Sequence, residues 1–195
     1  MNVIRTCLIG LLVLPLSAQA TSFSAGGALI LGLDSYKKAV NSTTGFLVNG
    51  AWDTTVLKSG IPARLSLGFG LMPGKETNGL KTSLTVLQLS GDILIETPFE
   101  GLRGVVGLSL NKYTAKYNGA ESQSAFDVDH HFPFHDVDGI KGGIRLGFDY
   151  SLTRQVSCEA LLQSTELAGR QRNDALIRKG AINPGWLQIG ARYKF

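Results

Sequence analysis

The sequence predicts an all-β fold: an eight-stranded antiparallel up-and-down barrel that crosses a membrane. Three observations predict it. Apolar and polar residues alternate with a period of two in eight segments, the connections between these segments alternate short and long, and an export signal precedes them. With 44% hydrophobic and 17% charged residues, the chain is too apolar for disorder, and a net charge of +4 is too small to indicate nucleic-acid binding.

Residues 1–20 are predicted to be a cleaved secretory signal peptide. Arg5 precedes an apolar run over residues 8–16, and the segment closes with Ala-Gln-Ala at 18–20, an A-x-A cleavage pattern. The apolar run is too short to span about 30 Å of hydrocarbon as a helix. We therefore expect an exported protein with one barrel domain over residues 21–195.

Each of the eight segments has one apolar face and one face of small and charged residues. The clearest alternation covers 61–71, 102–111, 140–152 and 187–195, and weaker alternation covers 23–34, 45–57, 84–96 and 156–166. Most segments are 10–14 residues long, which suits tilted strands that need about 9–11 residues to cross a bilayer. A soluble β-protein with these apolar residues in its core is the alternative, and the charged opposite face disfavours it.

The connections indicate which end of the barrel faces the periplasm. Short connections lie near 58–60, 97–101 and 153–155, and long ones near 35–44, 72–81, 117–139 and 168–185. Outer-membrane barrels have short periplasmic turns and longer extracellular loops, so both termini are expected on the periplasmic side.

Aromatic residues fit two interfacial girdles, one at each membrane surface. We expect the periplasmic girdle to contain Trp52, Tyr150, Tyr193 and Phe195, and the outer girdle to contain Phe46, Phe69 and Trp186.

The end of the chain resembles the small Gram-negative outer-membrane β-barrel proteins of the OmpA, OmpX and OmpW class. The last alternating strand, 187–195, ends in Tyr193 and Phe195, and Ile182-Asn-Pro-Gly-Trp186 before it is similar to the close of OmpW-type barrels, with Gly185 interrupting the usual Asn-Pro-Trp order. The resemblance implies an outer-membrane location and recognition of the last strand by the barrel-assembly machinery. We expect a monomer, with outer-membrane lipid and lipopolysaccharide as its surroundings.

The polar positions of the alternation should face the lumen. These positions bring eleven charged residues inside: Arg64, Arg103, Lys141, Arg145, Arg192, Lys194, Asp53, Asp92, Glu96, Asp149 and Glu159. An eight-stranded barrel has an interior just wide enough for side chains, and buried charges need partners. The sequence therefore predicts a lumen closed by ion pairs, with a narrow channel for small or hydrophobic solutes as the alternative.

All three histidines fall in one polar segment, DVDHHFPFHDVD at 127–138. Imidazole and carboxylate groups together suit Zn²⁺, Cu²⁺ or Ni²⁺. His130, His131, His135 and Asp129 are therefore candidate metal ligands, although a plain polar external loop explains the segment as well. No cofactor is expected elsewhere.

A lipid A-modifying enzyme is a further alternative. Such a hydrolase needs a nucleophile beside a base, and the histidines have only Ser122 and Ser124 near them in sequence. No G-x-S-x-G, H-E-x-x-H or phosphate-loop motif occurs, and Cys158 is expected on the lipid-facing side. We therefore expect no enzyme but a structural or surface-interaction role through the extracellular loops. Within these loops the basic segment 168–185 is a candidate contact for lipopolysaccharide phosphates.

Overall fold

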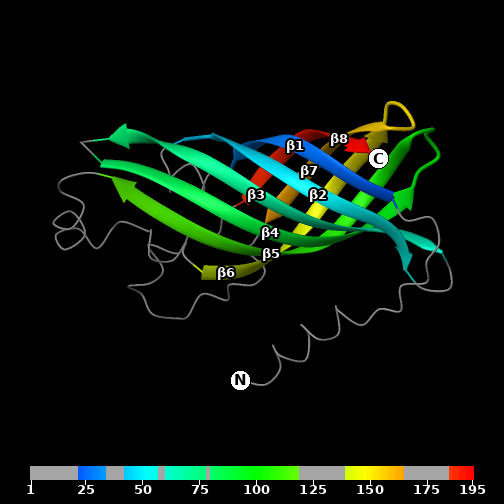
Figure 1. Ribbon diagram of the computed structural model, residues 1–195, viewed down its shortest axis with the longest axis horizontal. Helices are drawn as coiled ribbons and strands as arrows, with labels where there is room; N and C mark the ends of the chain where they lie inside the picture. Colours follow the sequence, from blue (N-terminus) through cyan, green and yellow to red (C-terminus); the bar gives the residue numbers. More distant parts are fainter. Residues whose placement is uncertain (1–21, 34–41, 57–59, 78–79, 119–138, 165–184) are drawn as a thin grey trace, which may run out of the picture.

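The computed structural model is a closed barrel in which eight antiparallel strands each pair with their neighbours in sequence and β8 pairs with β1 (Figure 1). The structure describes residues 22–33, 42–56, 60–77, 80–118, 139–164 and 185–195. Within these ranges no helix is long and apolar enough to span a membrane. The predicted eight-stranded antiparallel barrel is confirmed.

All eight strands fall on the predicted segments. They are β1 Ser22–Gly32, β2 Thr44–Val56, β3 Ile61–Thr77, β4 Leu80–Glu96, β5 Leu102–Asn118, β6 Gly139–Ser151, β7 Val156–Ser164 and β8 Gly185–Lys194. The middle strands β3, β4 and β5 have 17 residues each, which is longer than the alternation predicted.

The predicted long loop over 72–81 is wrong, because β3 and β4 remain paired from Leu71↔Thr85 out to Thr77↔Leu80, with a register shift between Pro73 and Glu76. Figure 1 shows β3, β4 and β5 projecting beyond the other strands at the end opposite the C-terminus. Backbone pairing does not require an apolar face, so the hairpin continues past the point where the apolar alternation stops.

Side chains alternate between a buried lumen and an exposed apolar outer surface. On β3, Arg64 and Ser66 are buried, whereas Leu65 and Leu67 are 40% and 57% exposed. This arrangement is the reverse of a soluble protein and is typical of a barrel whose outer surface meets lipid.

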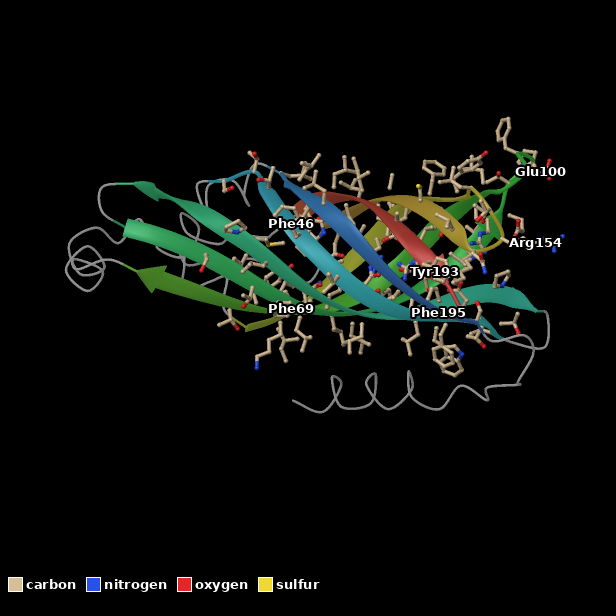
Figure 2. The ribbon with its side chains drawn as sticks, turned by 45° about the horizontal axis from the view of Figure 1, so that its top comes forward. Phe46, Phe69, Glu100, Arg154, Tyr193 and Phe195 are labelled. Carbon is tan, nitrogen blue, oxygen red and sulfur yellow. The ribbon has the colours of Figure 1, made fainter. Side chains whose placement is uncertain are left out.

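Exposed aromatic residues occur at more than one level of the outer surface, and Figure 2 shows Phe46 and Phe69 nearer the long connections than Tyr193 and Phe195. The prediction for Trp186 is wrong, since this side chain is fully buried. It has the same parity as Gln188 and Arg192 on β8, so the pleat turns it into the lumen.

The short turns, the start of β1 and the end of β8 share one end of the barrel. Gly60 and Gly101 adopt φ values of 72° and 75°, a left-handed conformation that suits glycine. The Ser151 amide donates to the Gly101 carbonyl at 2.8 Å, which joins two of these turns, and the Phe195 amide donates to the Phe23 carbonyl at 2.9 Å. The short connections therefore lie at the end where β1 begins and β8 ends, as the sequence predicted.

We expect Gly147→Ala to destabilise the barrel by about 1–3 kcal/mol, the usual effect of overpacking. A Cβ at this position would overlap the Ala160 carbonyl and lie 2.8 Å from the Leu161 Cα on the neighbouring strand. The matched control is Gly91→Ala, where a Cβ would meet nothing within 4 Å. Urea unfolding of the barrel in detergent micelles measures both, and equal midpoints would contradict the assignment of Gly147 as a packing position.

Candidate functional site: the lumen

Arg64 is the centre of a charged network that crosses the lumen. Its Nε donates to Asp53 Oδ1 at 2.6 Å, and its Nη2 donates to Asp149 Oδ2 at 3.2 Å. Its Nη1 lies 3.8 Å from Glu159 Oε2. Asp53 is on the adjacent strand β2, but Asp149 and Glu159 are on β6 and β7. Arg64 therefore joins walls of the barrel that share no backbone pairing.

Two further arginines complete this part of the network. Arg192 Nη2 donates to Glu159 Oε2 at 2.8 Å, and Gln188 Nε2 donates to the other Glu159 oxygen at 2.6 Å. Arg103 pairs with Asp149. Glu159 and Asp149 each contact two arginines, so these carboxylates are the points at which the ion pairs become one network.

Arg145 makes the second set of contacts inside the lumen, between β6 and β4. Its Nε lies 3.4 Å from Asp92 Oδ1, its Nη1 donates to Gln88 Oε1 at 3.3 Å, and the same nitrogen donates to the Ser90 hydroxyl. All three partners are on β4, whereas Arg145 is on β6. Room for this contact comes from Gly107 on the strand between them, because a Cβ there would overlap the Asp92 carboxylate.

The network is electrically balanced. Four arginines face four carboxylates, and each arginine lies within ion-pair distance of at least one of them. The residues are Arg64, Arg103, Arg145, Arg192, Asp53, Asp92, Asp149 and Glu159. Pairing is what makes burial of these groups tolerable, since removing one partner leaves an uncompensated charge at a cost of several kcal/mol.

Three other residues belong to the predicted lumen set. Lys141 and Lys194 occupy lumen-facing positions of β6 and β8 and are half-buried. Glu96 is exposed at the end of β4, where it pairs in register with Arg103 beside the 97–101 turn. The alternation of side chains along β4 predicts that Glu96 faces the lumen. This prediction is wrong because β4 ends at Glu96 and solvent reaches the side chain.

An uncharged layer, which the sequence reasoning missed, lies next to the charged network. Gln88 Nε2 donates to Gln163 Oε1 at 2.6 Å and to Asn111 Oδ1 at 3.0 Å, and Gln163 Nε2 also donates to Asn111 at 3.0 Å. These amides come from β4, β5 and β7 and are almost completely buried. In the sequence, these amides occupy the same alternating positions as the charged lumen residues, and this was the signal that could have identified them.

A second missed feature is a layer of apolar and aromatic side chains in the lumen near the long connections. We call it the outer apolar layer, and each member is at most 1% exposed. It consists of Ile30, Leu47, Met72, Leu84, Val86, Tyr113 and Trp186. The rings of Tyr113 on β5 and Trp186 on β8 meet edge to face with centroids 6.2 Å apart, so this layer also spans the lumen.

The candidate metal ligands His130, His131, His135 and Asp129 lie outside the described residues, as do Ser122 and Ser124. Among the residues that the structure does describe, no group of three or more histidine, cysteine or acidic residues is placed to hold a metal ion. Cys158 is a free cysteine on the exposed outer face of β7, as predicted.

No protein-family model and no curated protein sequence matches the chain. Solved structures do match. Neisserial surface protein A superposes with a TM-score of 0.54 at 14% identity, over 90% of this chain and 97% of that one. A major outer membrane protein from Thermus thermophilus gives a TM-score of 0.52 at 14% identity, over 91% of this chain and 100% of the other.

A de novo designed transmembrane β-barrel gives a TM-score of 0.50 at 13% identity, over 91% of this chain and 98% of the design. Sequence identities this low show a common fold and nothing about activity. The chain therefore has the fold of the small outer-membrane β-barrel proteins.

Proposed function

We propose that the protein is an integral outer-membrane barrel with a closed lumen, which acts structurally or through surface interactions of its extracellular loops and not as an enzyme. The observation that carries this proposal is that buried side chains meet across the lumen, Arg64 with Asp149 and Glu159 at one level and Tyr113 with Trp186 at another. The interior of an eight-stranded barrel is just wide enough for side chains, so such contacts together oppose a solute path. Each arginine of the charged network also lies within ion-pair distance of a carboxylate.

Its location is supported by the outer surface and by the signal peptide expected over residues 1–20. Exposed leucines and phenylalanines cover the barrel, which suits contact with lipid. The exposed Phe195 at the end of β8 supports recognition by the barrel-assembly machinery. Lipid and lipopolysaccharide are then the immediate partners of a monomeric barrel.

A surface role is supported by the asymmetry between the two ends. Turns near 57–60, 97–101 and 152–155 are short, whereas the segments 119–138 and 165–184 at the opposite end are long. The charges of these long segments are of opposite sign, which suits contacts with charged surface molecules. Long loops on a rigid scaffold are where binding residues concentrate.

We expect the refolded barrel to be silent in a planar bilayer, because side-chain contacts cross the lumen at several levels. Single-channel current is recorded at several salt concentrations. Stable steps that grow with salt would contradict closure and would make the narrow channel the leading function.

We expect Arg145→Ala and Glu159→Ala each to lower the free energy of unfolding by about 3–5 kcal/mol, since each leaves buried partners unpaired. The control is Arg154→Ala in an exposed turn (Figure 2), which should change little. Urea midpoints in micelles provide the comparison. Midpoints of the two lumen variants that equal that of Arg154→Ala would show that the network does not hold the barrel together.

An epitope inserted in segment 119–138 should bind antibody on intact cells, because that segment joins β5 and β6 at the outer end. The same epitope in the 152–155 turn should be detected only after the outer membrane is permeabilised. The reverse pattern would invert the proposed orientation.

A further inference from the structure

We propose that the outer apolar layer is the water-tight seal of the lumen, and that the charged network on its periplasmic side is a hydrated compartment that stabilises the barrel without sealing it. This inference rests on the proposed closed lumen and assigns closure to one layer of side chains. Ile30, Leu47, Met72, Leu84, Val86, Tyr113 and Trp186 would form a hydrophobic gate.

The lumen is chemically divided along its axis. Toward the long connections, the lumen-facing positions hold Ile30 on β1, Met72 on β3 and Trp186 on β8. Toward the short turns, the same strands hold Ser24, Arg64 and Arg192. The change from apolar to charged runs along these three strands, whereas Leu94, Val105 and Leu161 on β4, β5 and β7 form a small buried apolar cluster beside the charged residues.

The charged compartment contains buried polar atoms that lack a hydrogen-bond partner among the described residues. They include the Nε and Nη1 of Arg192, the hydroxyls of Ser24 and Ser66, and Oδ1 of Asn49. Arg192 and Ser157 face each other in the register of β7 and β8. Buried polar groups of this kind are satisfied by ordered water in folded proteins, so we infer that this part of the lumen is wet.

Such atoms also occur on β4 and β6, where Asp92 Oδ1, Arg145 Nε and Asp149 Oδ1 lack a hydrogen-bond partner among the described residues although these groups take part in ion pairs. Ion pairs and polar atoms open to hydration therefore occur together around the wall of the compartment. A network of this kind gives stability without excluding small ions.

The outer apolar layer has the opposite character. A Cβ at Gly70 would lie 2.7 Å from Val86 Cγ1 and 3.1 Å from Leu47 Cδ1, and a Cβ at Gly45 would lie 2.8 Å from Met72 Cγ. The layer therefore fills even the space beside its glycines. The polar atoms of this layer include the Trp186 indole N–H, which lacks a hydrogen-bond partner among the described residues, and the buried Tyr113 hydroxyl. A buried water typically bonds about three polar groups, so these two atoms alone do not support a water path.

Tyr113 and Trp186 close the centre of the layer because their rings meet across the lumen. Widening the lumen at this level requires these two side chains to separate. The layer is thus the step at which any solute or ion would be stopped, from either side of the membrane.

Conductance of single variants tests the assignment. Trp186→Ala removes the largest side chain of the seal and is expected to give reproducible, salt-dependent current steps in a planar bilayer. Arg145→Ala is the comparison, because it weakens the charged network and leaves the seal intact, and it is expected to stay silent while folded. Silence of folded Trp186→Ala, or current through Arg145→Ala alone, would overturn the inference. Current through the unaltered barrel would instead refute the proposed closure itself.

Thiol labelling tests the same inference without requiring that a pore opens. In a Cys158→Ser background, Ser157→Cys places a thiol in the charged compartment and Val86→Cys places one in the seal. A small water-soluble methanethiosulfonate reagent should label Ser157→Cys at least about tenfold faster, because inaccessible buried thiols are inert. Equal labelling rates in barrels with unchanged urea midpoints would overturn the inference.

Discussion

The narrowness of an eight-stranded barrel is the constraint on which the rest of this structure depends. Opposite walls are close enough for side chains to touch, so a lumen-facing residue must suit the far wall as well as its neighbours. Arg64 on β3 meets carboxylates on β6 and β7, and Gln88 on β4 meets Gln163 on β7. In a wider barrel these groups would face water and would need no partner.

The same constraint explains why glycine lies beside the largest lumen side chains. Gly107 leaves space for the Asp92 carboxylate and therefore for its contact with Arg145. Gly70 does the same for Val86 and Leu47 in the outer apolar layer. In the lumen, a glycine on one strand therefore leaves the space that a larger side chain of a neighbouring strand fills.

The two faces of the sheet meet different surroundings. Lipid covers the outer face, so leucine and phenylalanine are stable there while exposed, and the lumen face must satisfy its own polar groups. Past the ends of the other strands, β3, β4 and β5 remain paired with one another through backbone hydrogen bonds. This extension lies at the end of the barrel opposite the short turns.

The sequence by itself determined the number of strands, their order, their two faces and the end at which the short turns lie. Each of these depends on a period of two, which is a local property of the chain. Parity also brought Arg64, Arg145, Asp149 and Glu159 inside, because their neighbours in sequence are apolar.

Only the tertiary structure decided which of these groups meet. Strand tilt and closure set the height of each residue in the lumen, so Arg64 reaches Asp149 although the two are 85 residues apart. The amide layer, the inward position of Trp186, the exposure of Glu96 and the extended β3–β4 hairpin depend on that closure or on where pairing stops. Local alternation contains no information on either, because it describes one strand at a time.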